Sequence, residues 1–219
     1  ELIERQLVES KKIAFLPFDN ISGDPVLQIF SDGIATMLSS DLAEVGYQQG
    51  DGSTWVLPAS EIRHLEDPSI AGIYNKYGVD LIITGSIQHM GSTRSIHLSL
   101  VSGRDARQVK SIQLSIDANK LFEAQTQIRQ HVMALLGWHI PPALSQQFAA
   151  QKPRFDGAYK HYLQGQGYLY RFDHGDNISN ALKAFQAAID LDPSYADAYV
   201  GLAEAQLLNF IKNKKINLL

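Results

Sequence analysis

The pattern of apolar and polar positions in the first part of the chain predicts short strands that alternate with amphipathic helices. Residues 13–18 form an apolar run rich in β-forming side chains, which is typical of a buried strand. Beyond the loop at 19–24, apolar residues recur at helical spacing. We expect this helix to begin with Asp24 as its cap and Pro25 in its first turn, and to end at Gly46.

A second strand and a second helix follow in the same order. Residues 53–60 predict a strand, and residues 67–80 predict a helix with Asp67 or Ser69 as its cap and Gly78 at its end. The apolar residues of this helix recur on one face, so that face is expected to pack on the sheet.

The next three strands form a predicted antiparallel meander. Segments 81–90, 94–102 and 109–117 alternate apolar and polar residues, which is typical of strands with one solvated face. A turn is expected at 91–92, and a phase slip in the third strand predicts a β-bulge. With a long amphipathic helix at 119–138, the order becomes β-α-β-α-β-β-β-α. This order predicts an α/β or α+β domain whose mixed sheet carries helices on one or both faces.

The composition of the chain changes after this domain and suggests how the protein is divided. Residues 1–10 are expected to be an amino-terminal extension, and residues 11–138 to be the α/β domain. Residues 139–156 carry three prolines, which favours an inter-domain connection with at most one short helix. Residues 157–219 predict an all-α segment.

A repeat pattern marks this last segment. One helix pair carries spaced small and large residues in the forms L-x3-G-x2-Y and A-x3-F-x2-A-x4-P, at Leu163, Gly167, Tyr170, Ala181, Phe185, Ala188 and Pro193. This spacing is that of a tetratricopeptide repeat, with Leu163 in place of the usual Trp, and after Pro193 it restarts as the first helix of a second repeat. An array of fewer than two complete repeats does not bury its own core. We therefore expect these helices to dock on the first domain or to continue into further repeats. Apolar residues near the end favour both alternatives: Leu207, Leu208, Phe210 and Ile211.

The chain also resembles a known family in its first domain. The stretch "IAFLPFDNISGDPVLQIFSDGIATMLSSDL" resembles the start of the TolB-like amino-terminal module, and "YGVDLIITGSIQHMGSTRSIHLSLVSGRDARQV" resembles a later part of it. Together with tetratricopeptide repeats, the module resembles the regulatory half of bacterial signalling proteins. The resemblance implies an effector that is a CadC-like winged-helix transcription factor, a class III adenylate cyclase or a serine/threonine kinase. It implies no catalytic, cofactor-binding or metal-binding residues in this segment, and no ligand-binding residues can be assigned from it.

Composition and charge exclude several classes of function. The 219 residues include no cysteine, which excludes disulfides, thiol catalysis and cysteine-ligated zinc. The net charge is −4 and the only basic run is at 212–215, so nucleic-acid binding by this segment is not expected. No apolar run approaches the roughly 20 residues that span a bilayer, and the start of the chain is too polar for a signal peptide. A membrane tether outside the chain stays open, with a periplasmic location if a span precedes residue 1 and a cytoplasmic one otherwise.

The loop at 19–24 lies where nucleotide enzymes often bind phosphate, at the start of a helix. Asp19 and Asp24 would repel an anion there and Pro25 removes one donor, so a structural loop is favoured over an anion site. In the following "FSDG", we expect Gly33 to permit close approach of helix and sheet, and Asp32 to be solvated.

The histidines show no spacing typical of a metal site, and a pH switch is a less favoured alternative to ordinary surface positions. They lie at His64, His89, His97, His131, His139, His161 and His174.

Other chemically active residue types have structural explanations as well. Ser86 lies in mid-strand, where Gly85 is expected to relieve packing. The acids at 66–67 and 190–192 are expected to be helix caps rather than a catalytic pair. A dense tyrosine set is expected to form the helical core or, in part, a concave peptide-binding face: Tyr159, Tyr162, Tyr168 and Tyr170.

These observations favour a non-enzymatic sensory and protein-interaction segment of a larger bacterial signalling protein, without a cofactor. Protein partners are expected on the repeat surface, and a homodimer is an open alternative. The other hypotheses are a regulatory fragment of a kinase or cyclase whose catalytic domain lies outside the chain, and a small-molecule sensor.

Overall fold

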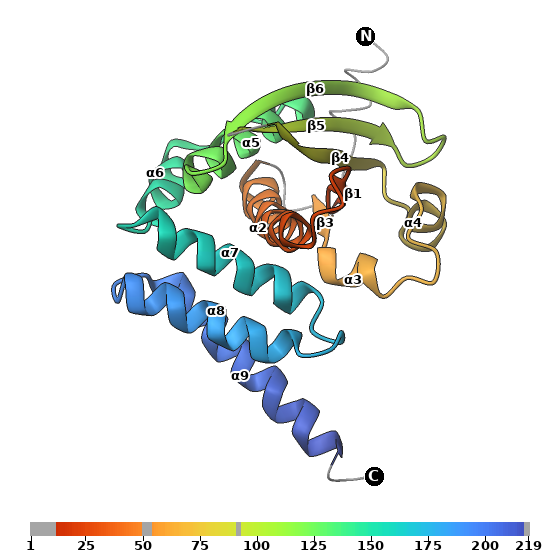
Figure 1. Cartoon of the computed structure of the whole chain (residues 1–219). Helices are drawn as coiled ribbons and strands as arrows, with labels where there is room; N and C mark the ends of the chain where they lie inside the picture. Colours follow the sequence, from red (N-terminus) through yellow and green to blue (C-terminus); the bar gives the residue numbers. More distant parts are fainter. Residues whose placement is uncertain (1–11, 50–53, 91–92, 217–219) are drawn as a thin grey trace.

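The computed structural model describes residues 12–49, 54–90 and 93–216, which form a mixed sheet, the helices around it and a helical extension (Figure 1). The strands are β1 Lys12–Phe15, β2 Asp19–Asn20, β3 Trp55–Leu57, β4 Leu81–Met90, β5 Thr93–Ser102 and β6 Gln108–Asp117. The helices are α2 Pro25–Gln49, α3 Ala59–Arg63, α4 Ile70–Tyr77, α5 Leu121–Leu136, α6 Pro142–Ala150, α7 Asp156–Tyr170, α8 Asn177–Leu191 and α9 Ala196–Ile216. The extension at 1–10 and the turn predicted at 91–92 lie outside the described residues.

The sheet has the strand order β3-β1-β4-β5-β6, with β2 paired to β4 beyond the end of β1. The pairs β1–β3, β1–β4 and β2–β4 are parallel, while β4, β5 and β6 form the predicted antiparallel meander. Leu100 pairs with Lys110 and Val101 with Gln108, so Val109 is the extra residue of a β-bulge. The mixed α/β sheet and the bulge predicted from the alternation are therefore confirmed.

Helices cover both faces of the sheet where it is parallel. Alternate side chains of β1 and β4 point to opposite faces, so Ile13 packs in the large cluster under α2 and α5 while Ala14 packs under α3 and α4. Side-chain caps close to each helix in sequence determine where α2 and α4 begin. The Asp24 carboxylate accepts the Val26 N–H at 2.9 Å, and the Ser69 hydroxyl accepts the Gly72 N–H at 3.1 Å.

Two predicted boundaries are wrong. The helix α2 does not end at Gly46 but continues to Gln49. A Cβ on Gly46 would lie 2.9 Å from Thr54 Cγ2 and 3.1 Å from the Trp138 ring, so this glycine allows close packing rather than a helix stop. The strand predicted at 53–60 is shorter, because Pro58 ends it and leads directly into the short helix α3.

The segment 139–156 contains the short helix α6, whose Leu144 and Phe148 are buried in the main core. The helices α7, α8 and α9 pack as an antiparallel hairpin and a third helix. The Phe185 ring of α8 lies between the two flanking helices at Gly165 and Gly201, where a Cβ would come within 2.5 and 2.4 Å of the ring. Small residues here let the helices close around one large ring.

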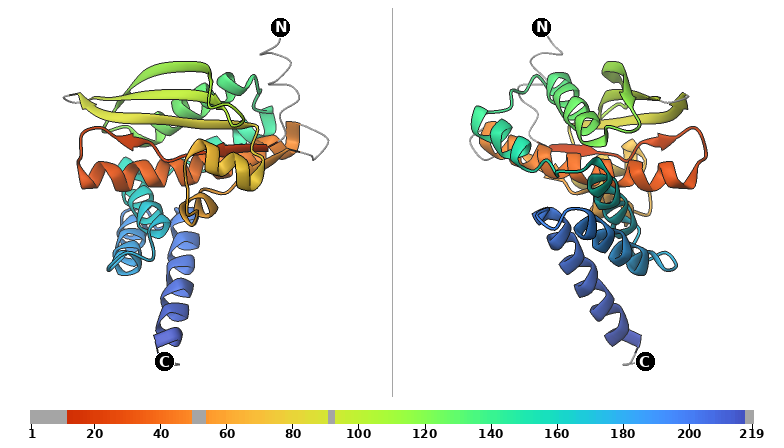
Figure 2. Two further views of the ribbon diagram at one scale, coloured as in Figure 1. Left: turned by 90° about the vertical axis from the view of Figure 1, so that its right-hand side faces the viewer. Right: turned by 60° about the vertical axis from the view of Figure 1, so that its left-hand side comes forward.

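One hydrophobic cluster runs from the sheet into these helices, so the helical segment docks on the α/β part. Figure 2 shows the last turns of α9 projecting away from the rest of the molecule. Of the apolar residues noted at the end, Leu208 is partly buried against the core, whereas Leu207, Phe210 and Ile211 are exposed. In the described part of the chain, no helix combines the length and apolarity needed to cross a membrane.

Candidate functional site

The helices α2 and α7 cross with their backbones in contact, and we call this contact the α2–α7 interface. A Cβ on Gly33 would lie 2.2 Å from the Leu163 carbonyl oxygen, and one on Gly167 would lie 1.9 Å from the Ile29 carbonyl oxygen. Both positions therefore require glycine. Gly33 was expected to let a helix approach the sheet, but that expectation is wrong because it lets two helices approach each other.

The prediction that Asp32 is solvated is also wrong, since its side chain is fully buried. Arg171, at the end of α7, forms an ion pair with both carboxylate oxygens, and Gln28 Nε2 donates to Oδ1 at 2.9 Å. The hydrogen bond to Asp32 raises the pKa of Arg171. The partner lies 139 residues away in sequence, so no local pattern could have shown it.

A second ion pair holds α3 against the loop that follows α7. Arg63 pairs with Asp173, and its guanidinium lies 4.8 Å from the centre of the Phe172 ring and 5.7 Å from that of Tyr170. Because cations are attracted to aromatic faces, this stacking adds to the ion pair. The α/β part is thus attached to the helical segment at two charged points.

A buried polar network joins α2, α5 and α7 further along the interface. Arg129 Nε donates to Asp41 Oδ2 at 2.7 Å, and Gln125 Nε2 donates to the same oxygen at 3.3 Å. The Tyr159 hydroxyl donates to the other end of the Gln125 amide. Burial raises the pKa of Asp41 in spite of Arg129, and burial also raises the pKa of Tyr159.

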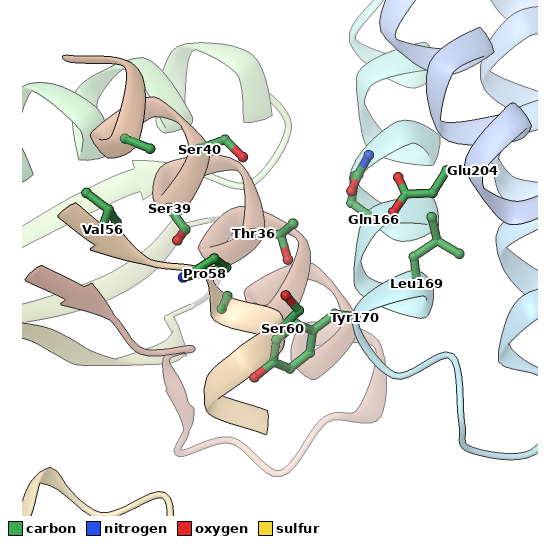
Figure 3. A pocket seen from close by; sticks show the side chains of 12 residues that line it. Thr36, Ser39, Ser40, Val56, Pro58, Ser60, Gln166, Leu169, Tyr170 and Glu204 are labelled. Atoms are coloured by element: carbon green, nitrogen blue, oxygen red, sulfur yellow. The ribbon is translucent and has the colours of Figure 1, made fainter. Parts of the chain in front are cut away.

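A groove lies beside these contacts, between α2 and β3–α3 on one side and α7 and α9 on the other (Figure 3). It consists of two adjoining cavities of about 250 and 340 Å³. Both cavities are lined by Thr36, Ser40, Gln166 and Glu204. We call this pair of cavities the interface groove.

The walls of the interface groove differ in chemistry. In Figure 3, Gln166 and Glu204 extend from the helical wall toward α2, which presents Thr36, Ser39 and Ser40. The first cavity is completed by Ala43, Val56, Pro58, Ala59, Ser60, Leu169 and Tyr170, and the second by Met37, Gln151, Tyr162 and Asp197.

Three polar groups of the groove have no hydrogen-bond or ion-pair partner among the described residues, whereas the Thr36 hydroxyl donates to the Asp32 carbonyl at 2.9 Å. Ser39 is 6% exposed, and its hydroxyl makes no hydrogen bond within the described residues. Loss of solvent around Asp197 and Glu204 raises the pKa of each carboxyl, and no cation pairs with either one in the described part of the chain. Burial raises the pKa of Tyr170 to about 12, so its hydroxyl stays protonated at neutral pH.

Most polar side chains of the loop at 19–24 bond to the loop itself or to β4, which agrees with the structural interpretation, whereas the buried Asn20 Oδ1 has no partner in the described part of the chain. Asn20 Nδ2 donates to the Asp24 carbonyl at 2.6 Å, and the Ser22 hydroxyl accepts the His89 N–H at 2.9 Å. Asp24 is occupied by the helix cap and lies 3.4 Å from His89 Nε2.

The other candidate residues are dispersed. The β4–β5 register pairs His89 with Arg94, as the predicted turn requires, and pairs Ser86 with His97. A Cβ on Gly85 would lie 2.1 Å from the His97 carbonyl oxygen, which confirms that this glycine relieves packing. Over the described ranges, no three His, Asp or Glu side chains gather in a way that could hold a metal ion.

The remaining predicted caps and tyrosines have clear positions. The Asp67 carboxylate accepts the Ser69 N–H at 3.0 Å. Asp192 is buried and accepts the Arg154 N–H at 2.7 Å. This hydrogen bond links the residues just before α7 to the turn between α8 and α9. Tyr159 and Tyr162 are buried core residues.

No protein-family model matches the chain. In sequence the chain is 22% identical over 207 residues to the "Putative adenylate cyclase 3" of Rhizobium meliloti (strain 1021). The matched stretch covers 94% of this chain and 34% of that protein. The chain therefore spans about a third of the length of this relative.

Several bacterial structures are similar to the chain at low identity. Lipoprotein GNA1162 from Neisseria meningitidis is 17% identical with a TM-score of 0.40, over 56% of this chain and 96% of that one. The PelC dodecamer subunit from Paraburkholderia phytofirmans is 12% identical with a TM-score of 0.40, over 59% and 89% of the two chains. TolB from Acinetobacter baumannii is 13% identical with a TM-score of 0.35, over 58% and 28%.

Proposed function

We propose that this chain is a non-catalytic regulatory segment of a larger bacterial signalling protein, and that the interface groove is where it receives a signal. The observation that carries the proposal is that α2 and β3–α3 form one wall of the groove while α7 and α9 form the other. A ligand that touches both walls binds better in one relative placement of the two parts, so its binding shifts that placement.

The sequence patterns support separate roles for the two parts of the chain in this proposal. Residues 11–138 would be a TolB-like sensory module, and residues 157–219 would be tetratricopeptide repeats that contact protein partners. The exposed side of α9 supports the second role, because several large apolar side chains lie there: Tyr199, Val200, Leu207, Phe210 and Ile211. Further repeats, a second copy of the chain or another protein would cover them.

The likeness to the Rhizobium meliloti protein supports an effector outside this chain, with a cyclase as the first candidate. A kinase or a transcription-regulating domain is the alternative that the resemblance also implies. In each case the segment itself would set the effector's activity rather than carry out chemistry.

Two measurements test the proposal. Residues 1–219 alone should form no cyclic nucleotide from ATP or GTP, and reproducible turnover by this segment would refute the non-catalytic role. In the full-length protein, Gly167→Ala should force α2 and α7 apart, because the added Cβ meets a backbone carbonyl at 1.9 Å. We expect effector output to change several-fold while the effector stays folded, and an unchanged output would contradict a regulatory role.

A matched control lies on the same helix. At Gly157 the nearest atom to an added Cβ is Leu191 Cδ1 at 3.3 Å, the end of a flexible side chain. Gly157→Ala should therefore leave both the interface and the effector output unchanged.

A further inference from the structure

The helix α9 places two carboxyl groups along the interface groove. Asp197 and Glu204 are seven residues apart, which is two helical turns, so they lie on one face of α9. Asp197 is partly buried and Glu204 lies at the open rim of the groove. Since no cation pairs with either acid in the described part of the chain, the groove carries uncompensated negative charge.

An independent feature of the opposite wall is a nearly buried side chain whose hydrogen-bonding group opens into the groove. Ser39 is buried, lines the first cavity and makes no hydrogen bond to any described residue. The hydroxyl oxygen is not among the fully buried atoms that lack a partner, so it opens into the cavity with its hydrogen-bonding capacity unused by the protein. A bound molecule with a hydrogen-bonding group at this point would satisfy it.

The size of the cavities limits what fits. About 250 and 340 Å³ lie at or below the low end of the range that takes drug-sized ligands, so the groove suits a compound with few heavy atoms. Hydroxyls at Thr36, Ser40 and Ser60 surround the first cavity, and both acids line the second.

We propose that the interface groove binds an organic ammonium or guanidinium group, which pairs with Asp197 and Glu204 while a polar group on the same molecule bonds to Ser39. The proposal rests on the regulatory function above and names the ligand class of that site. Two sources offer this chemistry: a free small cation, and the lysine or arginine side chain of a short peptide.

Titration calorimetry on residues 1–219 at low ionic strength distinguishes the sources. The first arm compares Nα-acetylarginine amide with its neutral isostere Nα-acetylcitrulline amide, and glucosamine with N-acetylglucosamine, together with putrescine. The second arm uses a blocked Gly-Lys-Gly tripeptide and its acetyl-lysine form. We expect the charged member of a pair to bind about tenfold or more tightly than the neutral one, since it forms charge-assisted hydrogen bonds. The arm with the tighter binding identifies the source.

Variants test which residues hold the cation. Asp197→Asn with Glu204→Gln should weaken binding about tenfold or more, and Ser39→Ala should weaken it about threefold. Asp190→Asn is the matched control, because Asp190 is exposed on α8, lines neither cavity and removes the same charge. If the double variant does not fold, Glu204→Gln alone gives the same test, since its side chain lies at the rim.

Three results would overturn the inference: equal affinity for charged and neutral members, affinity retained in the double variant, or no binding in either arm, which means that the groove holds only water. A failure of this ligand proposal can be told apart from a failure of the proposed regulatory function. If Gly167→Ala alters effector output but no cation binds, only the ligand class is wrong. If a cation binds but output does not respond to Gly167→Ala, the regulatory role is wrong.

Discussion

Arg129→Met removes the positive charge that lies beside a buried carboxylate. The side chains of Arg129 and Asp41 are only 4% and 6% exposed, and their atoms approach to 2.7 Å. After the substitution, Asp41 would keep a single donor among the described residues, Gln125 Nε2 at 3.3 Å. Methionine is long enough to keep much of the contact with Phe148, whose ring centre lies 4.1 Å from the Arg129 guanidinium. The main loss is therefore electrostatic.

The magnitude follows from the burial of the pair. Removing one partner of a buried ion pair leaves an uncompensated charge and costs about 3–5 kcal/mol. Domains are typically stable by about 5–15 kcal/mol, so the free energy of unfolding should fall by a large fraction at pH 7.

The loss should depend on pH, and its sign can be worked out. Burial already raises the pKa of Asp41 above its usual value, and losing Arg129 raises it further. An acid with a raised pKa in the folded state binds its proton more tightly when folded, so folding gains stability as the pH falls through that pKa. The difference between Arg129→Met and the wild type should therefore shrink between pH 7 and pH 5.

Urea unfolding followed by far-ultraviolet circular dichroism at both pH values measures this effect. Replacing the pair together, with Asp41→Leu and Arg129→Met, should recover most of the lost stability, because no charge remains buried. Lys120→Met is the control, since its pair with Glu123 is 58% and 52% exposed and should contribute less than about 1 kcal/mol. A loss below about 1 kcal/mol in Arg129→Met, or one that does not change with pH, would refute the reasoning.

Three further outcomes are expected from the same urea experiment. Gly167→Ala should lose about 2 kcal/mol or more, because its Cβ meets a backbone carbonyl, while Gly157→Ala should be neutral or gain up to about 1 kcal/mol. Ser39→Ala should change the free energy of unfolding by less than about 1 kcal/mol, because the hydroxyl makes no hydrogen bond to the described residues and opens into the groove, and a larger loss would contradict this. Arg171→Met should lose about 2–3 kcal/mol, less than Arg129→Met because Arg171 is 35% exposed while Asp32 is buried; an equal or larger loss would contradict this ranking.

The sequence predicted those features that local physical chemistry determines. Alternation of apolar residues located the meander, and caps located two helix starts, at Asp24 and at Ser69 as one of two candidates, because each depends on neighbours a few residues away. The errors at Asp32, Gly33 and Gly46 share one cause. Each of these residues takes its role from a contact in the tertiary fold, and neither the distant arginine, the crossing carbonyl nor the packed Trp138 ring leaves a local pattern.

The interface groove was missed for a related reason. Ser39 is one of several serines on a helix, and nothing in its neighbourhood in sequence shows that it is buried without a hydrogen bond. Asp197 and Glu204 have the spacing of one helix face, which is the only signal the sequence offered. That signal does not show that α2 would lie opposite them.

The contrast between the acids of the α2–α7 interface strengthens the case for a ligand. Asp32 and Asp41 are each paired with an arginine, so this fold supplies cations where a carboxylate is buried at the contact itself. Asp197 and Glu204 lie in the adjoining groove, and no cation reaches them from the described residues. Poor packing of the walls does not explain the difference, because α2 and α7, which also line the groove, contact each other through their backbones at Gly33 and Gly167. Where neighbouring acids are paired with cations by the fold and the acids of one groove are not, that groove is the place expected to carry function.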